Sequence, residues 1–194
     1  GLCEREVKAD KVIWPVVYKV MADDIQTIYD QIDKNNSIVM SFLKSGGIKA
    51  GDISVAVPNI SDKYAAEYGS NDRAYRYIAT STVTVCTADV DAVLALRSRQ
   101  SELLKKGVVT AGSNWENTVE FKYEGLNEIK PQMIEEATRN AREAAEKFAK
   151  DSDSNLGKIK TANQGTFTIE NRDSNTPHIK TVRVVTSVTY YLRN

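Results

Sequence analysis

Three aspartates, Asp23, Asp24 and Asp52, are the carboxylates whose positions could serve metal binding or acid–base chemistry. An apolar stripe at three- and four-residue spacing begins directly after Asp24 and is typical of an amphipathic helix. An aspartate placed just before such a stripe usually caps the helix by accepting its free N–H groups. We therefore interpret Asp23 and Asp24 as capping residues. The sequence predicts no catalytic residue, no metal site and no cofactor site, and we expect a protein without enzymatic activity.

The chain has two cysteines and one histidine, and this set does not match the usual spacing of metal ligands. Cys86 alternates with threonines in a predicted strand, so we expect a buried or half-buried free thiol there rather than a redox sensor. His178 follows a proline in a polar segment and is expected at the surface. Whether Cys3 or Cys86 is reactive stays open from the sequence.

Tyrosine and arginine are concentrated in one stretch between residues 64 and 77. Such side chains could stack on nucleic-acid bases, but they are also enriched in protein interfaces, and we favour the interface. Trp115 lies in another polar segment and is interpreted as a packing anchor. The predicted interface residues are Tyr64, Tyr68, Arg73, Tyr75 and Trp115.

Composition narrows the possible classes of protein. The 194 residues are 41% hydrophobic and 27% charged, which is typical of a folded globular chain and excludes low complexity or disorder. The 26 basic and 26 acidic residues give a formal net charge of zero, so the broad positive surface of a nucleic-acid binder is absent. Gly46, Gly47 and Gly107 do not form a phosphate-binding pattern. No apolar run reaches the length of a membrane-spanning helix.

Hydrophobic periodicity predicts alternating strands and helices. In the first half we expect a strand over residues 4–21, a helix after the aspartates that ends at Gly46, and strands over residues 52–60 and 73–87. A helix over residues 89–106 follows. In the second half we expect a strand within residues 108–123, a helix opened by Pro131, and a hairpin of residues 158–170 and 179–193.

This order is β-α-β-β, helix, β-α-β-β, which indicates an internal duplication. The segments 79–85 and 185–191 also resemble one another in sequence. Two such units predict an α+β fold with mainly antiparallel sheet and helices packed on one face. We expect a single domain over residues 1–194, with lobes at 1–88 and 107–194 and a connecting helix at 89–106.

Several segments resemble the SIMPL-domain family of bacterial periplasmic and envelope proteins. Residues 1–4 (GLCE) and 8–10 (KAD) resemble the family's G-x-G-E and later P-D start, with Cys3 and Ala9 as departures. Residues 42–48 (FLKSGGI) resemble its leucine-lysine-x-x-glycine-isoleucine helix end, with Gly47 as an insertion.

Three later segments extend the resemblance over essentially the whole chain. Residues 76–85 (RYIATSTVTV) resemble the family's central strand. Residues 123–126 (YEGL), the alanine-rich stretch 137–149, and residues 156–158 (LGK) resemble its most recognisable part. The pattern is diffuse and contains no catalytic fingerprint, so no site residue is carried over.

The resemblance implies a periplasmic or envelope protein of unknown function that is linked to envelope or oxidative stress and forms homo-oligomers. Membrane contact would then come only through an N-terminal signal or anchor ahead of Gly1, and we expect no nucleic-acid partner. The alternative is a monomeric or oligomeric module that binds a small molecule, or senses stress, in a groove between the two lobes.

Overall fold

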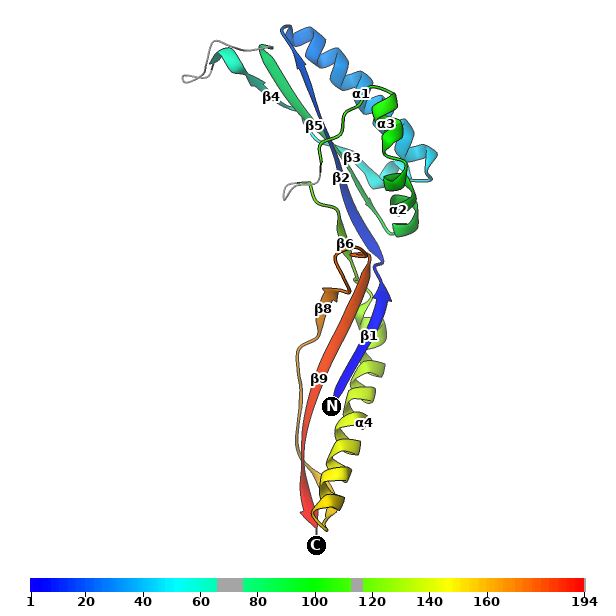
Figure 1. Ribbon diagram of the computed structural model, residues 1–194, viewed down its shortest axis with the longest axis vertical. Helices are drawn as coiled ribbons and strands as arrows, with labels where there is room; N and C mark the ends of the chain where they lie inside the picture. The colour runs from blue at the N-terminus through cyan, green and yellow to red at the C-terminus, as the bar shows by residue number, and fades with distance from the viewer. Residues whose placement is uncertain (66–74, 113–116, 194) are drawn as a thin grey trace. The chain divides into compact units, whose positions relative to one another are not determined.

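The computed structural model describes residues 1–65, 75–112 and 117–193, and Figure 1 shows their helices and strands. These residues divide into two compact units. One unit is Lys11–Phe121, and the other combines Gly1–Asp10 with Lys122–Asn194. Both units carry antiparallel strand pairs and helices, so the predicted α+β fold is confirmed.

The unit Lys11–Phe121 is built on a five-stranded sheet in the order β3-β5-β2-β6, with β4 also paired to β5. Its strands are β2 (Lys11–Ala22), β3 (Ile53–Val55), β4 (Asn59–Asp62), β5 (Tyr77–Thr87) and β6 (Glu120–Lys122). Short 3₁₀ turns lie at Ala50–Asp52 and Lys63–Ala65. Its helices are α1 (Ile25–Ser45), α2 (Val90–Ser98) and α3 (Ser101–Lys105).

Alternation along β2 and β5 builds the core of this unit. Trp14, Val16 and Tyr18 are buried on one face of β2, whereas the residues between them are only partly covered. The buried side chains of α1, which include Ile28 and Leu43, belong to the same core. The buried Tyr18 hydroxyl donates to the Ile32 carbonyl at 3.0 Å and lies 2.7 Å from Asn36 Oδ1. Its polar atom is therefore satisfied inside the apolar layer.

The second unit is a four-stranded sheet with one long helix beside it (Figure 1). β9 pairs on one side with β1 and on the other with β7 and β8, and all these pairs are antiparallel. Helix α4 packs along β1 and β9. The elements are β1 (Leu2–Lys8), α4 (Leu126–Asp151), β7 (Asn155–Gln164), β8 (Thr168–Asn171) and β9 (Ile179–Arg193).

Small residues allow α4 to lie close to this sheet. Ala137 and Met133 are fully buried against Cys3, Val182 and Val184. Gly1 approaches so closely that a Cβ atom there would lie 1.8 Å from the Ala137 carbonyl oxygen. Ala137 therefore permits a close approach between α4 and the sheet. Ala144 and Phe148, in the same alanine-rich stretch, are exposed.

Asp10 joins the first strand to the start of α4. Its Oδ1 accepts the Glu124 N–H at 2.8 Å and its Oδ2 accepts the Gly125 N–H, also at 2.8 Å. The Asp10 N–H in turn donates to the Lys122 carbonyl at 2.9 Å. A carboxylate at a helix N-terminus satisfies N–H groups that have no partner within the helix. Helix α4 begins at Leu126, directly after Glu124 and Gly125 and about a turn before the predicted start, and Pro131 lies inside it.

The structure divides the chain at different places from the expected lobes 1–88 and 107–194. The expected single strand 4–21 is two strands, β1 and β2, which break at Ala9–Asp10 and join different sheets. The expected connecting helix 89–106 is α2 and α3, and it belongs to the unit Lys11–Phe121. Its apolar side chains explain this, because Val93, Leu96 and Leu103 are fully buried.

The remaining element boundaries differ in smaller ways. The expected strand 52–60 is β3 and β4, separated by a segment that contains Pro58. The first strand of the last hairpin is likewise divided into β7 and β8. Helix α1 ends as predicted at the glycine pair, where Gly47 has φ +92° and the Ile48 N–H donates to the Leu43 carbonyl. Among the described residues, no helix is both long and apolar enough to cross a membrane.

The close approach of α4 can be tested by enlarging a small buried residue. We expect Ala137→Leu to lower the free energy of unfolding by about 1–3 kcal/mol, because the added volume must displace β1 or β9. Ala144→Leu is the matched control on the exposed side of the same helix, and its effect should stay within about 0.5 kcal/mol. Urea unfolding monitored by circular dichroism measures both. Equal effects of the two substitutions would contradict the packing described here.

Candidate functional site

The three aspartates have separate structural roles. Asp24 caps α1 by accepting the Thr27 N–H at 2.8 Å, which confirms the capping interpretation for this residue. Asp23 accepts the Arg76 N–H at 2.8 Å, whereas Asp52 lies in the 3₁₀ turn before β3. Across the described ranges, no group of three or more His, Cys, Asp or Glu side chains is placed to hold a metal ion.

The two thiols lie in opposite environments. Cys3 is 1% exposed between β9 and α4, and burial, assisted by a hydrogen bond with Glu136, raises the pKa of its thiol. Cys86 is exposed, so the expectation of a buried or half-buried thiol is wrong. Its position in β5 explains this, because residues 83, 85 and 87 face the core and Cys86 points to the opposite face of the sheet.

His178 is partly buried at the start of β9 and serves the fold through its backbone, since its carbonyl accepts the Ala9 N–H at 2.8 Å. The expectation of a surface residue is therefore only partly met.

Arg76 organises the described part of the tyrosine and arginine cluster. Its guanidinium lies 5.3 Å from the centre of the Tyr64 ring and 4.9 Å from that of Tyr77. Two of its nitrogens donate to the Asp62 carboxylate, the shorter bond being 2.9 Å. The contact with Arg76 restrains the exposed Tyr64 ring. The sequence analysis included Tyr64 as an interface residue but not the arginine that positions it.

The other predicted interface residues do not form one described cluster with Tyr64. Tyr75 lines a separate hollow beside Lys19 and Lys106. Tyr68, Arg73 and Trp115 lie outside the described residues.

Large apolar side chains are exposed along β3, β4, the segment between them and the 3₁₀ turn that follows β4. Val57 is 93% exposed and Tyr64 is 64% exposed. We refer to Val55, Val57, Ile60 and Tyr64 together as the β3–β4 surface. Pro58 restricts the backbone next to Val57, and Arg76 restrains Tyr64. Such restrained, exposed apolar groups lose little freedom when they become buried by a partner.

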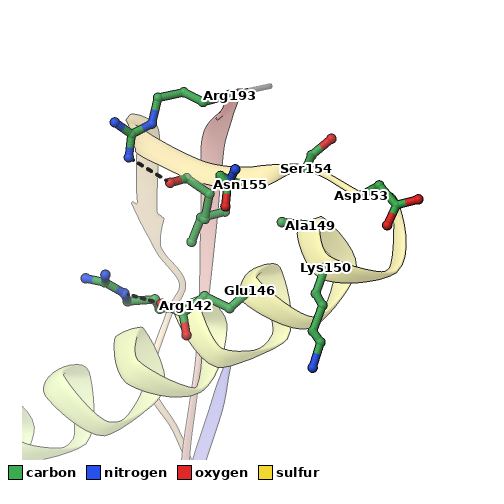
Figure 2. A pocket seen from close by; sticks show the side chains of 9 residues that line it. Arg142, Glu146, Ala149, Lys150, Asp153, Ser154, Asn155 and Arg193 are labelled. Atoms are coloured by element: carbon green, nitrogen blue, oxygen red, sulfur yellow. Dashed lines mark hydrogen bonds and ion pairs between the residues drawn. The ribbon is translucent and has the colours of Figure 1, made fainter.

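A hollow of about 840 Å³ lies between the end of α4 and the start of β7 (Figure 2). Arg142 is paired with Glu146 at 2.8 Å, and Arg193 reaches the Leu156 carbonyl at 3.4 Å. The side chains that line this hollow include positive and negative charges and few apolar groups. Ligand sites are usually mostly apolar with a few convergent polar groups, and this hollow lacks that character.

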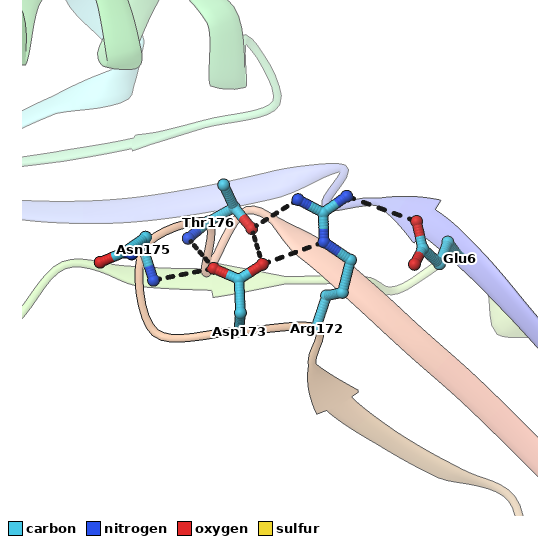
Figure 3. A network of polar contacts seen from close by, with 5 residues as sticks. All are labelled: Glu6, Arg172, Asp173, Asn175 and Thr176. Carbon is cyan, nitrogen blue, oxygen red and sulfur yellow. Dashed lines mark hydrogen bonds and ion pairs between the residues drawn. The ribbon is translucent and has the colours of Figure 1, made fainter.

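A polar network builds the loop between β8 and β9 (Figure 3). The Asp173 carboxylate accepts the N–H groups of Asn175 and Thr176 at 2.9 and 2.8 Å and the Arg172 Nε–H at 3.0 Å. These bonds and the one from the Thr176 hydroxyl hold the pKa of Asp173 well below its usual range. Arg172 also contacts Glu6 of β1 at 3.4 Å. Because every Asp173 contact lies within its own loop, this carboxylate stabilises the loop.

The two thiols should differ sharply in reactivity. We expect a water-soluble disulfide reagent at pH 8 to modify Cys86 in the native protein at least about tenfold faster than Cys3, because Cys3 is buried and its raised pKa disfavours the reactive thiolate. Mass spectrometry of timed digests measures each site, and the unfolded chain supplies the reference in which the two rates converge. Equal native rates would contradict the placement of Cys3.

Comparison with known proteins places the chain in a family. A model of the SIMPL family, described as proteins of unknown function (DUF541), matches residues 1–190. No curated protein matches the chain. The matched range includes both units and the segments 8–10 and 123–126, which the Asp10 hydrogen bonds bring together. The chain belongs to the SIMPL family.

Proposed function

We propose that this protein is a non-enzymatic component of the bacterial cell envelope that assembles into homo-oligomers. The β3–β4 surface is the observation that carries the proposal. It presents Val57 and Tyr64, both largely exposed, on restrained backbone and side-chain positions. Tyrosine is among the residues most often found at the centre of protein interfaces.

Family membership supports the location and the wider role. SIMPL proteins resemble periplasmic and envelope proteins that form rings or channels and are linked to envelope or oxidative stress. The proposed location is therefore the periplasm or the envelope, with an N-terminal signal or anchor. The balanced charge of the chain supports protein partners rather than nucleic acid.

Self-association can be measured by light scattering over a range of protein concentrations. We expect discrete oligomers, and we expect Val57→Lys combined with Tyr64→Lys to weaken association by at least about tenfold, because two apolar anchors are replaced by charges that would have to be desolvated.

Leu104→Lys is the matched control, because Leu104 is an apolar residue of α3 that is 59% exposed and lies outside the β3–β4 surface. It should leave the mass distribution unchanged. A monomer at every concentration, or an equal effect of the control, would refute assembly through this surface.

A further inference from the structure

A hollow of about 360 Å³ lies in the unit Lys11–Phe121, between α1, the end of β2 and the segment that follows α3. The hollow borders β2. In the sheet order β3-β5-β2-β6, β3 and β4 pair with the edge of β5 that faces away from β2. The hollow is therefore separate from the β3–β4 surface. Its described lining residues are Lys19, Val20, Met21, Gln31, Lys34, Asn35, Tyr75, Lys106, Gly107 and Val109.

The charges around this hollow have one sign. Lys19, Lys34 and Lys106 come from three different elements, and the described lining contains no carboxylate. Three acids lie near the lining residues in sequence. Asp30 accepts a hydrogen bond from Gln26, Asp23 accepts the Arg76 N–H, and Asp33, next to Lys34, is exposed and is not among the residues that line the hollow. Three ammonium groups around one concave surface favour an anionic ligand.

Part of the lining of this hollow is apolar and accessible. Met21, Tyr75 and Val109 are each exposed by 42% or more and line it together. Exposed apolar groups inside a concavity gain stability when an apolar ligand covers them. The volume lies at the lower end of the range of about 300–1,000 Å³ that is usual for small-molecule sites.

We propose that this hollow binds a medium-chain fatty acid anion. The carboxylate lies among Lys19, Lys34 and Lys106, and the alkyl chain covers Met21, Tyr75 and Val109. Neither half of the site suffices, since a bare anion leaves the apolar side chains of the lining uncovered and a neutral alkyl compound leaves the lysines without an anion. This site is independent of the proposed assembly, which involves other residues.

Isothermal titration calorimetry with octanoate tests the proposal, with acetate and octyl glucoside as probes of the head group alone and the chain alone. Octanoate and octyl glucoside are used below the concentrations at which they form micelles. We expect saturable binding of octanoate and none of the other two at the same concentration. Saturable binding of acetate with equal affinity would overturn the proposal in favour of a simple anion site, and no binding of octanoate would also overturn it.

Matched pairs of lysine substitutions locate the site. Lys34→Gln with Lys106→Gln removes two lining charges, and we expect at least about tenfold weaker octanoate binding. Lys44→Gln with Lys105→Gln removes two charges from the same helical regions without touching the lining, and it should weaken binding by less than about threefold. Circular dichroism verifies that both variants are folded. Equal weakening by the two pairs would show non-specific attraction and overturn the proposal.

Discussion

The two hydrogen bonds from the backbone to the Asp10 carboxylate are the contacts on which the unit containing α4 depends. They attach the start of α4 to the end of β1, while the neighbouring Ala9 N–H bonds to the chain just before β9. Three segments far apart in sequence therefore meet at residues 9–10. From this point β1 runs antiparallel to β9 until the Gly1 carbonyl accepts the Thr186 N–H, and α4 covers the pair with Ala137 and Met133. Removing the carboxylate would leave N–H groups at the helix start without this partner.

Apart from β1, which has seven residues, the strands at the borders of the described sheets are poor templates for adding further strands, and this bears on how copies could associate. β3, β4 and β6 have three or four residues each. β7 is long, but it carries register shifts around Ile159 and the lysines Lys158 and Lys160. Short, irregular or charged edge strands resist pairing with other chains. Association is therefore proposed through apolar side chains on the β3–β4 surface and not through continuous strand pairing.

Local patterns in the sequence predicted most of the elements, and the errors arose where distant contacts decide. The sequence predicted the apolar stripe of α1, its cap at Asp24 and its end at the glycine pair, because each of these features depends on neighbours within a few residues. The break at Ala9–Asp10 was not predicted, because pairing with β9 and β5, both far along the chain, is what assigns β1 and β2 to different sheets. The exposure of Cys86 was predicted wrongly because the sequence of β5 alone does not show which of its two faces α1 covers. Lys19, Lys34 and Lys106, which line the hollow of about 360 Å³, come from three separate elements, so no local motif indicated them. The segments 8–10 and 123–126 did carry a signal for the Asp10 contact, since both resemble family motifs, but only the structure shows that they meet.

Equilibrium unfolding of Asp10 variants tests this account most directly. Asp10→Ala removes both acceptors, and we expect it to lower the free energy of unfolding by about 1–2 kcal/mol, whereas Asp10→Asn keeps one acceptor and should cost less. Glu143→Ala on the exposed face of α4 is the control and should change stability by no more than about 0.5 kcal/mol. Hydrogen exchange should also be faster at the N–H groups of Glu124 and Gly125 in Asp10→Ala. If Asp10→Ala were as stable as the parent protein, with unchanged exchange at Glu124 and Gly125, the central place given to this carboxylate would be wrong.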